Sequence, residues 1–424
     1  MIVSIVVLTA FVITYYFMLN EKYKTSVMAM LVALSLAATG MVSEISIENL
    51  PKIIDFNTLG LLVGMMIMVG LLKRTGFFHF VSVYAIRAGK GDLKKTLILI
   101  VLSVALLSAF LDNVTTLLVF APILFSISDV AGLDPTQLIT MGILSSNIGG
   151  VSTLIGDPPN ILIGSASKLS FLSFMSHLAP IAVVVLILML VRTVRNTQES
   201  EEIKQNLRKF ASVDPKSVIT DPKKMKYIVT VFALVIFCFS IHTIVKVELS
   251  LVAMLGAVIT LAITGEDFEE AAKEIEWNTI FFLIGLFILT YSLKQVGLTD
   301  AVAKALIRLT YPPIILSMLI WLAGFGAMFL GAVPATTIMI PIVKSMINSG
   351  LPTTTWWALA LGVGLGANGS PIGAAANMVG LGLLKKFSGK TISFPTFFKK
   401  NISFTLISLT IATCYILLML LVGW

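Results

Sequence analysis

Long apolar segments, separated by short polar ones, run along the chain almost to its last residue. A helix needs about 20 mostly apolar residues to cross a bilayer, and many of these segments have about that length. The pattern therefore predicts membrane-spanning helices. The segments occupy residues 2–19, 25–43, 57–73, 96–111, 114–128, 136–168, 177–192, 227–245, 249–264, 278–293, 312–330, 332–347, 356–388 and 402–423.

Four of the segments do not fit a simple span. Residues 96–111 and 114–128 are short and meet at the polar stretch 112–116, which predicts two half-helices of a re-entrant hairpin. Residues 136–168 and 356–388 are too long, and Gly, Pro and Asn gather in their middles. Glycine permits a sharp turn and proline removes a backbone donor, so each long segment is predicted to be one broken helix.

The second half of the chain resembles the first. A polar stretch at residues 192–226 separates them. Identical residues recur at one shift over about 90 positions, which predicts an internal repeat. A shift of 221 residues aligns Asn57 and Thr58 with Asn278 and Thr279, Gly64 with Gly285, Lys73 with Lys294, Gly76 with Gly297, Thr115 and Thr116 with Thr336 and Thr337, and Asn147 with Asn368, and a shift of 217 then aligns Gly156 and Asn160 with Gly373 and Asn377. We expect a first repeat at residues 1–195, a linker at 196–225 and a second repeat at 226–424.

Composition and charge narrow the class of protein. The 424 residues are 57% hydrophobic and 12% charged, whereas about one-quarter of a soluble domain is charged. The net charge of +8 could suggest nucleic acid, but the basic residues lie between apolar segments and form no basic face with aromatic residues. We therefore expect no nucleic-acid partner. Cys238 and Cys414 lie within apolar segments and are expected to be packing residues.

The distribution of basic residues predicts the orientation in the membrane. If the hairpins do not cross, each repeat has five crossings, counting its broken helix once, and an odd number inverts the second repeat. With both termini outside, most of the 30 Lys and Arg fall in cytoplasmic loops, as the positive-inside rule requires. We expect an all-α polytopic protein of the cell (inner) membrane, with two inverted repeats, about ten crossings, two re-entrant hairpins and a cytoplasmic linker. Secondary transporters have this architecture.

Two carboxylates lie deep within apolar segments, namely Asp112 and Asp157. A charge at the bilayer centre costs roughly 2.5 to 3.5 kcal/mol, so these acids are candidates for carrying a proton or holding a cation. The alternative is that each acid caps a half-helix through backbone N–H groups. Their aligned positions in the second repeat are Val333 and Ala374, so the repeat lacks the charge there.

Basic side chains are absent from the predicted midplane. Lys168, Lys294 and Lys344 lie near segment ends, where their charges can reach the interface. A neutral or cationic substrate therefore fits better than a multiply charged anion. No metal site and no cofactor are predicted, and no residue is a candidate for catalysis.

The motifs around the hairpin tip and the first break resemble a known family. Asp112-Asn113-Val114-Thr115-Thr116, Asn147-Ile148-Gly149-Gly150 and Gly156-Asp157-Pro158-Pro159-Asn160 resemble the ion transporter superfamily, in the branch of arsenite permeases (ArsB), NhaD-type sodium/proton antiporters and the P protein. The resemblance implies a substrate site at the tips and breaks. It would consist of Asn113, Thr115, Thr116, Asn147, Asn160, Thr336, Thr337, Asn368, Ser370 and Asn377, with Asp112 and Asp157 for proton or cation coupling.

The sequence is compatible with several candidate substrates. Dicarboxylate members of the superfamily carry Asn at both tips, whereas the aligned second tip here is Val333-Pro334-Ala335, which argues against an anion symporter. Amides and hydroxyls could bind arsenite as its uncharged trihydroxide, since two cysteines cannot supply three thiolates, and the same residues permit sodium/proton exchange equally well. We favour proton-coupled arsenite and antimonite efflux because the compact chain resembles plain arsenite permeases. Sodium/proton antiport is the main alternative, and an intramembrane aspartyl protease is the rival from another class.

The expected partners are few. They are the lipid bilayer and a small inorganic substrate with protons or sodium. A homodimer is possible in such an architecture. The chain has no Walker A motif, so ATP coupling would need a separate cytoplasmic ATPase subunit, for which the acidic stretch 266–276 is a candidate docking segment. We expect that stretch to be a solvated loop.

Overall fold

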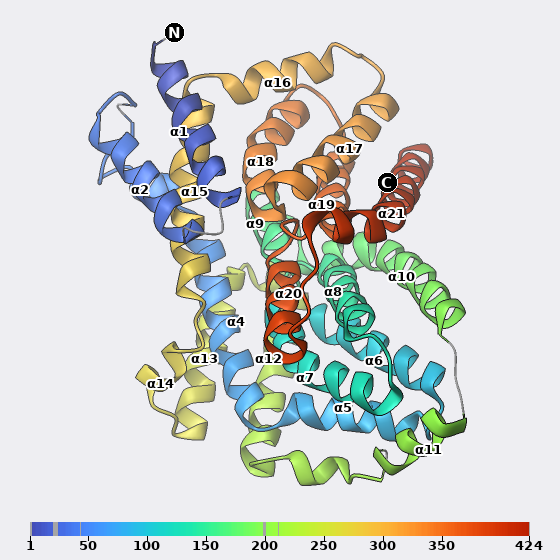
Figure 1. Ribbon diagram of the computed structural model, residues 1–424. Helices are drawn as coiled ribbons and strands as arrows, with labels where there is room; N and C mark the ends of the chain where they lie inside the picture. The colour runs from blue at the N-terminus through green and yellow to red at the C-terminus, as the bar shows by residue number, and fades with distance from the viewer. Residues whose placement is uncertain (1, 20–23, 43, 198–200, 211, 424) are drawn as a thin grey trace.

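The computed structural model describes residues 2–19, 24–42, 44–197, 201–210 and 212–423, and these residues fold into 21 α-helices and two short 3₁₀ turns without a strand (Figure 1). Each half of the chain contributes ten helices in the same order, and α11 (Glu201–Phe210) lies between the halves. The first ten are α1 (Ile2–Leu19), α2 (Thr25–Ala38), α3 (Leu50–Ile53), α4 (Phe56–Arg74), α5 (Phe77–Ala88), α6 (Leu93–Ser108), α7 (Asn113–Ala131), α8 (Pro135–Val151), α9 (Pro158–Ser167) and α10 (Phe171–Asn196). The second ten are α12 (Pro222–Val245), α13 (Leu249–Thr264), α14 (Phe268–Ala272), α15 (Trp277–Gln295), α16 (Leu298–Ile307), α17 (Pro312–Leu330), α18 (Ala332–Asn348), α19 (Thr354–Gly366), α20 (Ala375–Ser388) and α21 (Phe394–Val422).

Seven of the described helices are long and apolar enough to cross a membrane. They are α4, α7, α10, α12, α15, α17 and α21. Several are shielded only partly by protein: on α12, for example, Leu234 and Phe237 remain exposed. Such apolar side chains are suited to lipid contact. The all-helical, multi-pass architecture expected from the sequence is confirmed.

The two halves interlock instead of lying side by side. Helix α4 packs on α13 of the other half, and α15 packs on α2. Both contacts use a glycine: a Cβ on Gly64 would lie 2.5 Å from the backbone of Ala253, and one on Gly285 would lie 2.8 Å from the backbone of Ala29. Small residues let helix backbones approach closely in membranes. The aligned pair Gly64 and Gly285 therefore performs the same packing role in both repeats.

Each half also holds a hairpin packed on a broken helix. In the first half, α6 and α7 meet at a tip and contact α8, and α8 is separated from α9 by residues 152–157. In the second half, α17 and α18 meet at Gly331 and contact α19, and α19 is separated from α20 by residues 367–374. The hairpins and breaks predicted from the sequence are confirmed. We call α6–α9 and α17–α20 the hairpin bundle, and α1–α4, α12, α13 and α15 the outer helices.

The structural equivalence of the hairpins differs from the sequence alignment. Asp112 precedes α7 and Gly331 precedes α18, while Pro122 and Pro341 lie inside these two helices. The counterpart of Asp112 is therefore Gly331, and the alignment with Val333 is wrong. The first tip is longer: residues 109–112 lie between α6 and α7, whereas only Gly331 lies between α17 and α18. The number of residues that separates equivalent positions of the two repeats therefore changes within the hairpin.

Short helices replace loops at both ends of the molecule. Helix α5 lies at one end with α11, and α16 lies at the opposite end with the N-terminus (Figure 1). We call these ends the α5 end and the α16 end. The stretch 266–276 is exposed as expected at Asp267, Glu269 and Glu270, but it is not a loop, because it includes α14. Its Glu266 and Glu274 form ion pairs with Arg74. Residues 198–200 and 211 of the expected linker lie outside the described residues.

Candidate functional site

The first hairpin tip places an acid and an amide at the start of α7. The side chain of Asp112 accepts a hydrogen bond from the backbone N–H of Thr115 at 2.7 Å, so it caps the helix. Asn113 occupies the first position of α7 and is buried. Asp112 remains half-buried. The capping interpretation of Asp112 is thus confirmed.

Both breaks are held open by one asparagine each. Asn160 Nδ2 donates to the carbonyl oxygens of Val151 and Thr153 at 3.0 and 2.8 Å. In the second half, Asn377 Nδ2 donates to the carbonyl oxygens of Ala367 and Ser370 at 2.8 and 2.7 Å. These carbonyls lost their helical partners where the chain unwinds, and a buried carbonyl needs a partner. Asn160 and Asn377 therefore stabilise the breaks in the same way.

The residue before each second half-helix is extended. Asp157 has φ −152° and ψ 138°, and Ala374 has φ −138° and ψ 155°. The two residues precede α9 and α20, so the predicted equivalence of Asp157 and Ala374 is confirmed. The side chain of Asp157 forms no capping bond to α9. It is available for contacts outside its own helix.

A chain of buried side-chain hydrogen bonds joins the first tip to both breaks. Asn113 Nδ2 donates to Asn147 Oδ1 at 3.2 Å and to Asp157 Oδ1 at 3.3 Å. Asn147 Nδ2 in turn donates to Asn368 Oδ1 at 3.0 Å and to Asn377 Oδ1 at 2.8 Å. All five side chains are at most 6% exposed. We call Asn113, Asn147, Asp157, Asn368 and Asn377 the amide network.

Asn147 and Asn368 are not equivalent positions, contrary to the sequence alignment. Asn147 lies inside α8, whereas Asn368 lies in the break that follows α19. The two residues instead contact each other across the repeats. Asn368 Nδ2 has no hydrogen-bond partner among the described residues although it is fully buried. An unpaired buried donor is costly, so the network holds one donor that the described residues do not satisfy.

The hydroxyl groups of the predicted site have local partners. Thr116 Oγ1 donates to Asp112 O, Thr336 Oγ1 to Ala332 O, and Thr337 Oγ1 to Pro334 O. Ser370 Oγ donates to Met328 O. These bonds anchor the hydroxyls to backbone carbonyls near the tips. Thr115 is half-buried, and its backbone N–H is the group that bonds Asp112.

A third carboxylate near the tip escaped the sequence analysis. Glu276 precedes α15, and its Oε2 accepts from Thr279 Oγ1 at 2.9 Å. The charge on Asp112 lies within electrostatic range of both Asp157 and Glu276. The internal repeat could have revealed Glu276. Asp55 and Thr58 occupy the aligned positions at the start of α4, and they form the same side-chain hydrogen bond as Glu276 and Thr279. The described residues contain no group of three His, Cys, Asp or Glu side chains arranged for a metal ion.

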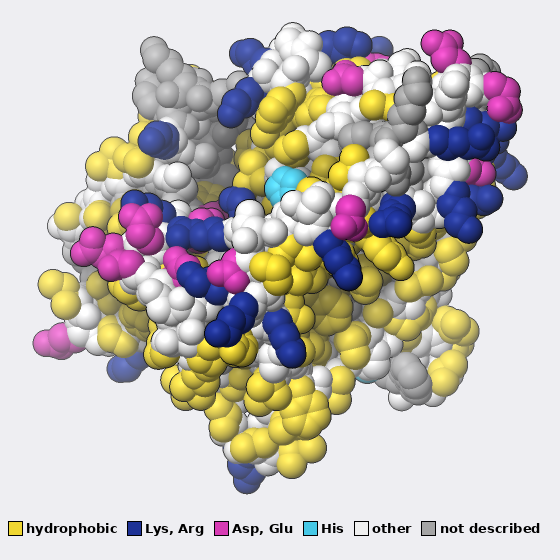
Figure 2. Space-filling view, turned by 90° about the horizontal axis from the view of Figure 1, so that it is seen from below, with side chains coloured by type: hydrophobic (Ala, Val, Ile, Leu, Met, Phe, Trp, Pro, Cys, Tyr) yellow, Lys and Arg dark blue, Asp and Glu magenta, His cyan; other side chains and the backbone are white. Residues whose placement is uncertain are grey.

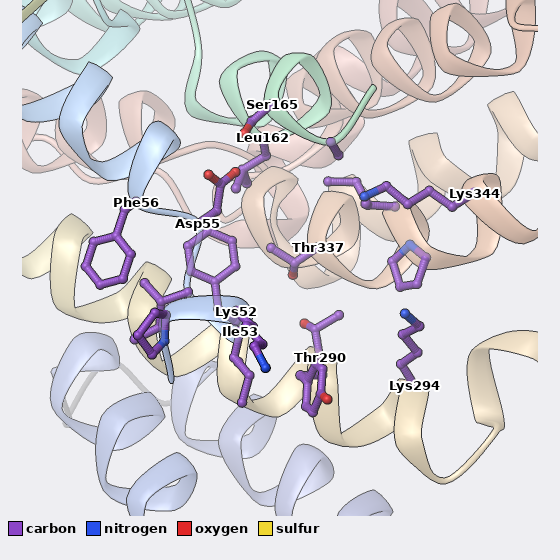
Figure 3. A pocket seen from close by; sticks show the side chains of 17 residues that line it. Lys52, Ile53, Asp55, Phe56, Leu162, Ser165, Thr290, Lys294, Thr337 and Lys344 are labelled. Carbon is purple, nitrogen blue, oxygen red and sulfur yellow. The ribbon is translucent and has the colours of Figure 1, made fainter. Parts of the chain in front are cut away.

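A cavity of 480 Å³ lies between the outer helices and the hairpin bundle. Its walls come from α3 and the start of α4, from α15, and from α9 and α18 (Figure 3). Thr337 is the one predicted site residue that lines it, and the amide network does not. Three lysines, Lys52, Lys294 and Lys344, also line the cavity. Five of the predicted residues thus form the network, Thr337 lines the cavity beside the second hairpin, and the other six belong to neither.

The chain is similar to a known family, to curated proteins and to a solved structure. The profile of the family described as "CitMHS: Citrate transporter" matches residues 15–362. An uncharacterized transporter of Mycobacterium tuberculosis is 33% identical, over 97% of this chain and 98% of that protein. The P protein of Homo sapiens is 30% identical, over 97% of this chain and 59% of that protein. The crystal structure of the YdaH transporter of Alcanivorax borkumensis has a TM-score of 0.63 at 14% identity, covering 94% of this chain and 98% of that one.

Proposed function

This chain belongs to the CitMHS citrate transporter family, and from that premise we propose that it couples proton entry to the export of arsenite and antimonite. Membership makes it a membrane transporter and not an enzyme. The substrate and the coupling ion are our proposal. The observation that carries it is the amide network, which connects the first hairpin tip to both broken helices through buried hydrogen bonds.

The chemistry of the network favours a small solute without negative charge. Its members offer amide donors, amide oxygens and one carboxylate, and among the described residues no Lys or Arg donates to it. Arsenite is mainly the uncharged trihydroxide near neutral pH, and its hydroxyl groups can both donate and accept. Cys238 and Cys414 are only two thiols, so thiolate ligation is not available for three arsenic bonds.

The carboxylates supply a means of proton coupling. Asp157 Oδ1 accepts from Asn113 Nδ2, so the charge state of Asp157 bears directly on the network. Protonation of a carboxylate changes it from an acceptor to a donor. In our proposal Asp157 or Asp112 takes up a proton from outside and releases it inside, and this biases the return of the empty carrier.

Alternating access would arise between the two parts of the fold. The hairpin bundle carries both tips and both breaks, and the outer helices enclose it through the contacts of α4 with α9 and of α15 with α18. Movement of the bundle against the outer helices would expose the network to one side at a time. We place the α5 end in the cytoplasm, because Lys and Arg side chains gather on that face (Figure 2).

Sodium/proton antiport is a second candidate that one observation favours. Asp112 lies within electrostatic range of Asp157 and of Glu276, although within the described residues the three acids do not form a group arranged for a metal ion. Carboxylate and amide oxygens are suitable ligands for a small cation. The same atoms could therefore exchange sodium for protons.

Uptake into everted membrane vesicles under an imposed proton gradient tests the proposal. Arsenite, sodium and citrate are compared in one preparation. Citrate is included because the family that the chain matches is described as a citrate transporter family. We expect arsenite accumulation that an uncoupler abolishes, without sodium-induced dequenching of a pH dye. Dequenching by sodium without arsenite uptake would establish cation antiport, and citrate-driven proton movement would establish an anion substrate; either result would overturn the proposal.

A further inference from the structure

We propose that the cavity between the outer helices and the hairpin bundle is a binding site for a small multivalent oxyanion, separate from the amide network. The charges that surround it carry the argument. Lys52 comes from α3, Lys294 from α15 and Lys344 from α18, and all three line the cavity. Figure 3 shows Lys294 and Lys344 on one side of Thr290 and Thr337, and Lys52 on the other side. Three lysines from three helices thus line one space, and each of them is also exposed to solvent.

The nearby carboxylates are already engaged. Asp55, which lines the cavity, accepts from the backbone N–H groups of Asn57 and Thr58 and from Thr58 Oγ1. Glu44 accepts from Tyr291 Oη and from Gln295 Nε2. Within the described part of the chain, no ion pair involves Lys52, Lys294 or Lys344. The positive charges that line the cavity therefore exceed the one negative charge there.

A buried hydroxyl without a partner points to the same space. Thr290 lines the cavity and is 8% exposed, and its Oγ1 has no hydrogen-bond partner among the described residues. Figure 3 shows Thr290 between Lys294 and Ile53 on the cavity wall. A buried polar atom needs a partner. Rotation of the Thr290 side chain toward the cavity would let an oxyanion accept from this hydroxyl while the charge of the anion faces the lysines.

The inverted repeat shows that this arrangement is specific to one end of the molecule. Lys73 is the counterpart of Lys294 and forms an ion pair with Glu274 at 3.7 Å. Asp55 and Glu276 directly precede α4 and α15, so Ile53 stands where Glu274 stands in the other repeat. At the α5 end Glu274 neutralises Lys73. At the position beside Lys294 that corresponds to Glu274, the chain has the apolar Ile53, which lines the cavity. Among the described residues, the aligned lysine is paired with an acid at the α5 end and has no ion pair at the α16 end.

Direct binding tests the inference without reference to transport. Isothermal titration of the purified full chain with sulfate and with phosphate, at constant ionic strength, should show saturable binding, and nitrate should not bind. The double variant Lys294→Gln with Lys344→Gln should weaken binding about tenfold or more, because it removes two charge-assisted contacts. Thr290→Val, which keeps the shape and removes the hydroxyl, should weaken it several-fold.

The control is Lys385→Gln, which removes an exposed lysine on α20 that does not line the cavity. It should leave sulfate binding unchanged. Absence of binding by both probes would overturn the inference. Equal binding of nitrate, or binding that the cavity variants do not weaken, would also overturn it. Because the titration measures no flux, its result is independent of whether arsenite is the transported solute.

Discussion

Asn147 Nδ2 donates a hydrogen bond to Asn368 Oδ1 at 3.0 Å, and the two residues belong to broken helices of opposite repeats. Both side chains are at most 1% exposed. A buried amide pair at this place connects the halves through a directional contact, beside the bond from Asn147 Nδ2 to Asn377 Oδ1. Any relative movement of the two breaks must therefore change this bond.

Replacing Asn147 should impair both transport and stability. Asn147→Ala leaves Asn113 Nδ2 with one partner fewer and removes the donor to Asn368 and Asn377. Each buried group left unpaired costs about 1 to 3 kcal/mol. We expect at least a tenfold loss of substrate uptake and a lower midpoint of thermal unfolding in detergent. Asn49→Ala is the matched control, because Asn49 is half-buried and makes no capping bond; an equal effect of the two variants would contradict the role of the network.

Asp157→Asn should uncouple transport from the proton gradient while the protein still folds. The amide keeps the shape of the side chain and retains an oxygen that can accept from Asn113 Nδ2. It cannot take up and release a proton at neutral pH. We expect gradient-driven uptake to disappear, with substrate exchange across the membrane retained. Flux in the presence and absence of an uncoupler measures this. Full gradient-driven activity in Asp157→Asn would remove the residue from the coupling mechanism.

Close backbone approach at the second break predicts that Gly373 cannot be replaced. A Cβ on Gly373 would lie 2.1 Å from the carbonyl oxygen of Ala367, and a backbone atom cannot yield as a side chain can. We expect Gly373→Ala to lower the thermal midpoint strongly or to prevent recovery of folded protein. Gly382→Ala is the control, because nothing lies within 4 Å of its Cβ position and it is inside α20. There alanine should be neutral or stabilising by up to about 1 kcal/mol.

The sequence predicted the elements of the fold because they depend on local signals. Pro158 and the glycines of the breaks interrupt apolar runs, and Asp112 caps the helix that it precedes. These signals act over a few residues and are visible in one chain. The repeat added long-range information, since Gly64 and Gly285 mark the same packing contact in both halves.

What the sequence could not predict depends on contacts between distant residues. The identity of Asn147 and Asn368 suggested equivalence, but the structure pairs them as neighbours. Lys294 and Lys344 lie near the ends of apolar segments, where a charge ordinarily reaches the interface, and only the folded chain brings both to one cavity. Glu276 belonged to an acidic stretch, and only the folded chain brings it within electrostatic range of Asp112.

The orientation in the membrane is the last prediction. In a background without Cys238 and Cys414, a single cysteine is introduced at Ser217 or at Lys304. Ser217 lies in the turn packed on α5 and is exposed, and Lys304 is exposed on α16. With the α5 end in the cytoplasm, a membrane-impermeant maleimide should label Lys304→Cys in intact cells. Ser217→Cys should react only after permeabilisation. The reverse result would invert the topology, and with it the direction in which the proposed proton gradient acts on Asp157.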